Sequence, residues 1–138
     1  MQELYKEIIL DHFKRPRNQG ELPGADIEEH VNNPLCGDEV TVYANFRDDK
    51  IADVRFTGRG CSISQASASM MTEQLLGKNL EEAEAEVERF KTMMAGKEDF
   101  PEAEDLTALE GVIRHPSRIR CATLAWTAFH KGLLEQKA

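Results

Sequence analysis

The chain has 138 residues, of which 41% are hydrophobic and 30% are charged, and its formal net charge is −8. That length predicts a single domain, residues 1–138, large enough to bury a core without disulfide support. The acidic balance argues against a nucleic-acid partner, because such proteins need a basic surface to neutralise phosphates. No apolar run approaches the roughly 20 residues that cross a bilayer, and the charged N-terminus lacks signal-peptide character. We therefore expect a cytoplasmic protein with no membrane partner.

The acidic excess is concentrated in one part of the chain. Residues 81–110 contain eleven acidic and three basic side chains, whereas the remainder holds fourteen of each. We interpret this segment as a solvated helix face, with a docking surface for a basic partner as the alternative.

The first half of the chain predicts one helix followed by a small sheet. The helix covers residues 2–13, with Leu4, Ile8 and Phe13 near one face, and stops before Pro16, which cannot continue it. A short edge strand is expected at 26–32. Hydrophobic side chains then alternate with polar ones over 40–47 and again over 52–56, where Ala52, Val54 and Phe56 share a face. These two strands, joined by a turn at 48–50, predict an antiparallel hairpin with one buried face.

The second half reads as helical. One helix is expected over 64–76, and a second is capped by Asn79, with Glu82 at the capping-box position. Its apolar stripe, at spacings of three and four, consists of Leu80, Ala83, Val87, Phe90 and Met94. A shorter helix opens at Pro101, and the last begins at Pro116. The predicted fold class is α+β, a small antiparallel sheet of about three strands covered by helices.

Three cysteines are present, and each lies at a junction between predicted elements. Cys36 lies in a turn before the hairpin, Cys61 in the glycine-flanked exit from it, and Cys121 near the start of the last helix. The odd number and a reducing cytosol disfavour structural disulfides. Metal ligands, nucleophiles and buried core thiols remain as the alternatives.

The spacing Cys36-x-Asp38 suggests a shared ion, because residues two apart in extended backbone point to the same side. Thiolates from Cys61 and Cys121 would complete a tetrahedral set of three sulfurs and one oxygen, which suits zinc or an iron–sulfur unit. The competing interpretation is three separate core thiols, since free cysteine is among the most buried residue types.

The histidines and serines do not indicate a further catalytic or metal-binding site. The four histidines are scattered, and we expect surface or capping roles for them. The serines at 62, 64, 67 and 69 have no accompanying Ser/His/Asp pattern, so we interpret them as small residues for close helix packing.

Three stretches, 33–38, 58–71 and 120–126, together resemble the IscU/NifU N-terminal family of iron–sulfur cluster assembly proteins, and the opening 4–12 fits as well. Within that family the chain is most similar to the SufU branch. Arg120 stands where IscU proteins carry a histidine, the IscU chaperone motif just upstream is absent, and the gap from Cys61 to Cys121 is long.

The resemblance implies roles for four residues. Cys36, Asp38, Cys61 and Cys121 match the family's metal ligands, and the three cysteines its cluster-binding residues. It implies bound zinc or a transient 2Fe–2S or 4Fe–4S cluster. Cys36 would accept sulfur in the SufU branch, and Cys121 in the IscU branch.

The partners implied are a cysteine desulfurase of the SufS type and downstream iron–sulfur assembly or acceptor proteins. The main interpretation is thus a zinc-holding sulfur acceptor, an accessory protein rather than an enzyme. A scaffold on which a cluster is built and passed on is the alternative. The third interpretation is a structural zinc module, in which the metal only stabilises the fold.

Overall fold

The computed structural model describes residues 3–34, 37–97 and 104–137, and the side chains of 6–34, 37–97 and 105–136. Helix α1 precedes three strands, and all later elements are helical, which confirms the predicted α+β class. In chain order the elements are α1 (Glu3–Lys14), β1 (Ile27–Asn33), β2 (Asp38–Arg47), β3 (Lys50–Arg59), α2 (Ser62–Leu75), α3 (Leu80–Met94), α4 (Glu104–Thr107), the 3-10 helix η1 (Ala108–Arg114) and α5 (Pro116–Lys137). None of the helices described is both long enough and apolar enough to cross a bilayer.

The sheet has the order β1-β2-β3, and both pairs are antiparallel. β1 pairs with β2 alone, as the expected edge strand should. Asp48 and Asp49 both adopt positive φ, 53° and 63°, at the turn between β2 and β3. Two such residues give a tight turn whose twist matches that of the flanking strands. The predicted hairpin is confirmed.

Burial in the hairpin departs from the predicted alternation at Tyr43, which is buried although it lies between the buried residues Val42 and Ala44, and again in β3. Val54 and Phe56 are fully buried, but Ala52 is exposed and Ile51 is buried in its place. Asn45 pairs with Asp53 and Phe46 with Ile51, so Ala52 is an extra residue in β3. Such a bulge reverses the alternation of side chains beyond it. The predicted buried face is therefore wrong at Ala52.

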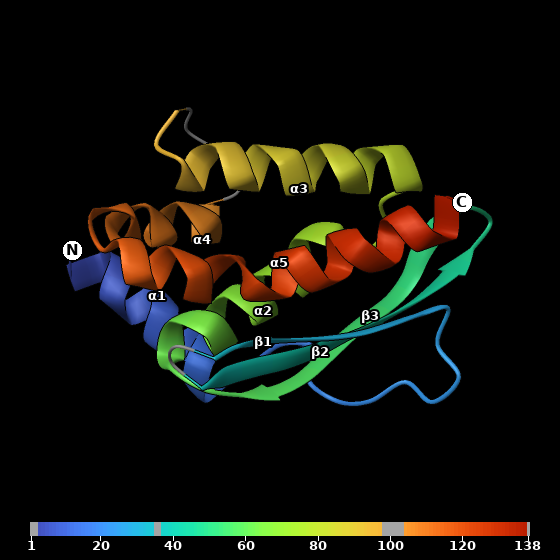
Figure 1. Cartoon of the computed structure of the whole chain (residues 1–138), viewed down its shortest axis with the longest axis horizontal. Helices are drawn as coiled ribbons and strands as arrows, with labels where there is room; N and C mark the ends of the chain where they lie inside the picture. The colour runs from blue at the N-terminus through green and yellow to red at the C-terminus, as the bar shows by residue number, and fades with distance from the viewer. Residues whose placement is uncertain (1–2, 35–36, 98–103, 138) are drawn as a thin grey trace.

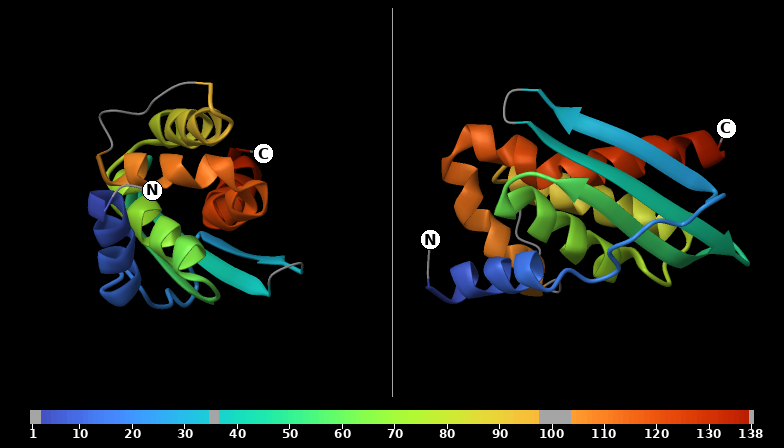
Figure 2. Two further views of the ribbon diagram at one scale, coloured as in Figure 1. Left: turned by 90° about the vertical axis from the view of Figure 1, so that its left-hand side faces the viewer. Right: turned by 90° about the horizontal axis from the view of Figure 1, so that it is seen from below.

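The helices gather on one side of the sheet in two layers (Figures 1 and 2). α5 packs on β1 and β2, and α2 packs on β3 and against α5. α1 lies along α2, while α3 lies farther from the sheet and contacts α5. The rings of Phe90 on α3 and Trp126 on α5 stack with centroids 4.2 Å apart. The core thus holds α5 in a fixed place across the sheet.

The helix starts predicted from sequence are mostly confirmed. Asn79 and Glu82 form the expected capping box at the start of α3, and α5 begins at Pro116. All but one member of the α3 stripe are fully buried, and Leu80 is partly buried. Pro101 lies outside the described residues.

The buried face of α1 agrees with the prediction only in part: Ile8 is partly buried against the core, but other positions differ. Phe13 is 41% exposed, whereas Ile9 and His12 are buried, and the side chain of Leu4 lies outside the described set. The helix is rotated so that residues 9 and 12 face α2, where His12 finds polar partners inside the protein.

Candidate metal centre

The candidate site lies at one end of the sheet. Because β2 and β3 are antiparallel, the first residues of β2 adjoin the last residues of β3, and Glu39 faces Arg59 in the register. Asp38, the first residue of β2, is therefore next to Cys61, which follows β3 and is the N-cap of α2. Local chain geometry alone brings these two side chains together.

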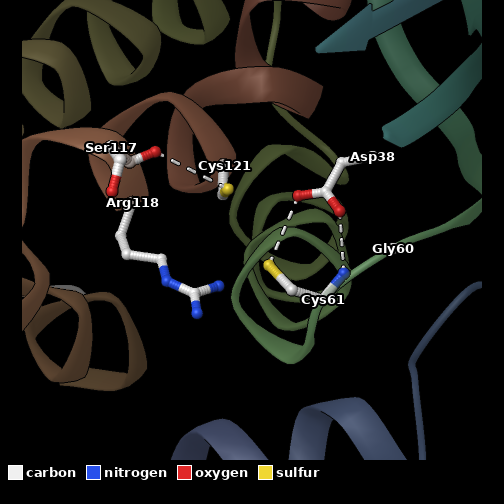
Figure 3. A pocket seen from close by; sticks show the side chains of 6 residues that line it. All are labelled: Asp38, Gly60, Cys61, Ser117, Arg118 and Cys121. Carbon is white, nitrogen blue, oxygen red and sulfur yellow. Dashed lines mark hydrogen bonds between the residues drawn. The ribbon is translucent and has the colours of Figure 1, made fainter. Parts of the chain in front are cut away.

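The Asp38 carboxylate is held tightly beside Cys61. Its Oδ1 accepts the backbone N–H of Cys61 at 2.9 Å, and its Oδ2 accepts the Cys61 thiol at 3.3 Å (Figure 3). Asp38 is only 2% exposed, whereas Cys61 is partly exposed. The carboxylate and the sulfur thus meet at the edge of the protein interior.

Cys121 reaches the same place from the second turn of α5. Its side chain is 1% exposed, and its Sγ lies 3.8 Å from the carbonyl oxygen of Ser117, one turn earlier in the helix. Ser117 is not apparent from the sequence, although a residue four positions before a helical cysteine shares its face. With Asp38, Gly60, Cys61 and Arg118, these residues line a pocket of about 430 Å³.

The three described side chains fit a metal ion. One ligand atom each from Asp38, Cys61 and Cys121 lies within 4.8 Å of the other two. Zinc binds thiolate sulfur at about 2.3 Å and carboxylate oxygen at about 2.0–2.2 Å, which puts neighbouring ligands of a tetrahedron roughly 3.5–4 Å apart. Two sulfurs and one carboxylate oxygen are also ligand types that zinc accepts. Cys36, the fourth predicted ligand and predicted sulfur acceptor, lies outside the described residues.

A family model described as the NifU-like N terminal domain matches residues 4–138. The chain belongs to this family. The recognition made from the sequence motifs is therefore confirmed.

Relatives of this NifU-like chain bear two kinds of name. The zinc-dependent sulfurtransferase SufU of Bacillus subtilis is 44% identical, over 97% of this chain and 92% of the relative. The iron–sulfur cluster assembly scaffold protein IscU of Streptococcus pyogenes is 42% identical, over 96% and 84%. A crystal structure from Fervidobacterium islandicum, described as an iron–sulfur cluster assembly scaffold protein for the SUF system, has a TM-score of 0.86. It is 38% identical, and the match covers 92% of this chain and 94% of that one.

A second group of polar side chains lies where α1, α2 and α4 meet in this NifU-like fold. His12, Glu73 and Asp105 have ligand-type atoms within 4.8 Å of one another. Nδ1 of His12 is 2.8 Å from the Ser69 hydroxyl, and Nε2 is 2.6 Å from Asp105 Oδ2. Both ring nitrogens thus have protein partners. The expectation of a surface or capping role is wrong for His12, which is 1% exposed.

The same contacts place serine, histidine and aspartate in a row, which the sequence does not indicate. Ser69, however, is completely buried, and its hydroxyl also accepts the backbone N–H of Arg17. A nucleophile needs an approach path for its substrate. The row therefore joins α1, α2 and α4 and is not a hydrolase site.

Proposed function

We propose that this NifU-like protein is a zinc-holding sulfur acceptor of iron–sulfur cluster assembly, which takes persulfide sulfur from a cysteine desulfurase in the cytoplasm. The observation that carries the proposal is the convergence of Asp38, Cys61 and Cys121 in the lining of one pocket. The name of the Bacillus subtilis relative, a zinc-dependent sulfurtransferase, supports the same choice.

The proposed ligand set is Asp38, Cys61 and Cys121, with Cys36 as the fourth member. Bound zinc favours the thiolate form of cysteine and adds no redox chemistry of its own. The residues of the chain supply the rest. Asp38 is fixed by the Cys61 amide, and Arg118 places a positive charge at the rim of the pocket.

The proposed transfer is a thiol–disulfide type of exchange at Cys36. Its thiolate attacks the outer sulfur of the desulfurase persulfide, and a new S–S bond forms on Cys36. The donor's S–S bond breaks, and the desulfurase cysteine leaves as a thiolate. The sulfane sulfur only changes its carrier, so the step needs no external oxidant or reductant. Cys121 is the less suitable acceptor because it is almost fully buried.

The assignment of Cys36 is tested by supplying a desulfurase and cysteine to Cys36→Ser and Cys121→Ser variants. We expect Cys36→Ser to abolish stimulation of the desulfurase and to carry no persulfide, as read by mass spectrometry. Cys121→Ser should lower stimulation through loss of zinc while Cys36 still accepts sulfur. A first sulfur found on Cys121, with Cys36→Ser accepting normally, would refute the assignment.

The second candidate function is a scaffold on which an iron–sulfur cluster is built and passed to downstream assembly or acceptor proteins. The name of the Streptococcus pyogenes relative favours it, and three cysteines with an aspartate also suit a cluster. Anaerobic purification followed by metal and sulfide analysis separates the two. Zinc near one per chain without sulfide supports the acceptor, whereas iron with labile sulfide supports the scaffold.

A further inference from the structure

The Asp38 carboxylate lies directly against the backbone of Gly60, where a side chain would otherwise stand. A Cβ built on Gly60 would overlap Asp38 Oδ1, and would lie 2.6 Å from Cγ and 2.9 Å from Cβ of Asp38. Carbon atoms that are not bonded normally stay at least about 3.5 Å apart. The space occupied by the carboxylate therefore exists because residue 60 has no side chain.

Rotation of the Asp38 side chain would not remove this overlap. The Cβ of Asp38 is itself too close, and it is fixed by the backbone of β2. Any side chain at position 60 must therefore push the start of β2 away from the end of β3. Gly60 also has φ +147°, a conformation that other residues rarely adopt.

The position of the carboxylate depends on the same few atoms. Oδ1 receives the Cys61 N–H from the residue next to Gly60, and Oδ2 is in contact with the Cys61 sulfur. A shift that opened room for a Cβ would lengthen both contacts. A ligand that is misplaced by about 1 Å no longer shares an ion well with its neighbours.

We propose that Gly60 is a positioning residue of the metal centre, which seats the Asp38 carboxylate against the Cys61 amide so that it can share an ion with Cys61 and Cys121. The inference rests on the metal role proposed above for these three residues. It assigns Gly60 a function in ligand geometry, in addition to the conformational freedom that its φ requires.

The test compares Gly60→Ala with Gly77→Ala. Gly77 also has a positive φ, +85°, but a Cβ there would meet nothing within 4 Å. Both variants are strained, and only the first displaces Asp38. We expect Gly60→Ala to weaken zinc binding about 10–100-fold in competition with a chromophoric chelator, the usual cost of losing a group that orients a ligand. Gly77→Ala should bind zinc as the unmodified chain does.

A double-mutant cycle shows whether Gly60 acts through Asp38. In an Asp38→Gly background, Gly60→Ala should cause little further loss of zinc affinity, because both the carboxylate and the Cβ that it would displace are absent. The NMR shift of the Cys61 amide, measured without metal, should change in Gly60→Ala toward its value in Asp38→Gly. Asp38→Glu tests the position of the carboxylate without straining the backbone at residue 60. The extra methylene moves the carboxylate away from the Cys61 amide, so this variant should also bind zinc more weakly.

Several results would overturn the proposal. These are unchanged zinc binding in Gly60→Ala or Asp38→Glu, an equal loss in Gly77→Ala, additive losses in the cycle, or a Gly60→Ala chain that does not fold. None of these measurements uses the desulfurase. The zinc-binding measurements can therefore refute the positioning role of Gly60 without bearing on whether Cys36 accepts sulfur, and the desulfurase assay can refute the role of Cys36 without bearing on Gly60.

Discussion

Glu29 on β1 lies where the end of α5 crosses the strand, and its side chain is only 13% exposed. Burial raises the pKa of the Glu29 carboxyl above its ordinary value, and a hydrogen bond with Glu135 raises it further. Lys131, whose Nζ is 3.6 Å from Glu29 Oε2, opposes the shift without cancelling it. A single carboxyl thus makes the contact between β1 and α5 sensitive to pH.

The sign follows from proton linkage. The folded state holds the Glu29 proton to a higher pH than the unfolded chain does, so stability falls as the pH rises from the ordinary pKa through the raised one. Glu29→Gln removes this loss. We expect it to raise the free energy of unfolding near pH 7 and to give no gain below the ordinary pKa, as measured by urea denaturation across pH. Glu28→Gln, at the exposed neighbouring position, is the control. If Glu29→Gln raised the free energy of unfolding equally at low and at neutral pH, the raised pKa of Glu29 would not be the cause of the effect.

At the scale of elements, His12 joins three helices that are distant in sequence. It lies on α1, and its partners Ser69 and Asp105 lie on α2 and α4. Replacing the ring by a methyl group would leave the buried Ser69 hydroxyl without one partner. It would also detach α4, the helix that leads through η1 to the start of α5.

We therefore expect His12→Ala to lower the free energy of unfolding by about 1–3 kcal/mol, the usual cost of unpairing a buried polar group. The matched control is His30→Ala, since His30 is exposed and forms its hydrogen bond across the sheet surface, with Thr41. Denaturant unfolding measures both variants. Equal effects of the two substitutions would show that the junction at His12 adds no stability.

The capping box of α3 is a second interaction at this scale. The Asn79 side chain accepts the N–H of Glu82 at 2.8 Å, and the Glu82 carboxylate accepts the N–H of Asn79 at 3.0 Å. Asn79→Ala should cost about 1 kcal/mol of stability, and Asn79→Ser should retain most of it because serine also caps well. Thermal unfolding followed by circular dichroism compares the two. Equal losses would mean that the cap is not the source of the effect.

At the scale of the whole molecule, the metal centre and the core are separate. The three described candidate ligands come from the start of β2, the N-cap of α2 just after β3, and the second turn of α5. The large apolar side chains that hold the layers together, such as Trp126, Phe56 and Phe90, are fully buried, and none of them lines the pocket at the candidate site. A metal bound at this site would tie together the ends of elements that already have their own packing.

Removal of the metal should accordingly leave the fold in place. We expect a chelator to leave the far-UV circular dichroism of the helices nearly unchanged, while the midpoint of thermal unfolding falls because a ligand of the folded state has been removed. Faster hydrogen exchange should be confined to the residues around Asp38, Cys61 and Cys121. Global unfolding on chelation would instead favour a metal with a purely structural role.

The sequence by itself determined those features that depend on near neighbours in the chain. The alternation along β2, the Asn79 cap and the start of α5 at Pro116 each involve residues within a few positions of one another. The placement of Asp38 beside Cys61 is nearly as local, since it follows once a hairpin is assumed. The family motifs carried the recognition in the same way, because they are contiguous stretches of sequence.

Only the tertiary structure decided the features that depend on packing between distant segments. Cys121 reaches Asp38 because α5 crosses the sheet, and His12 is buried because residues 57 and 93 positions away supply its partners. Neither periodicity nor spacing contains that information. The bulge at Ala52 likewise depends on how β3 pairs with β2, because one extra residue in β3 changes which side chains face the core. The contact between the Asp38 carboxylate and the backbone of Gly60 also depends on this pairing, because it needs a residue without a Cβ at position 60.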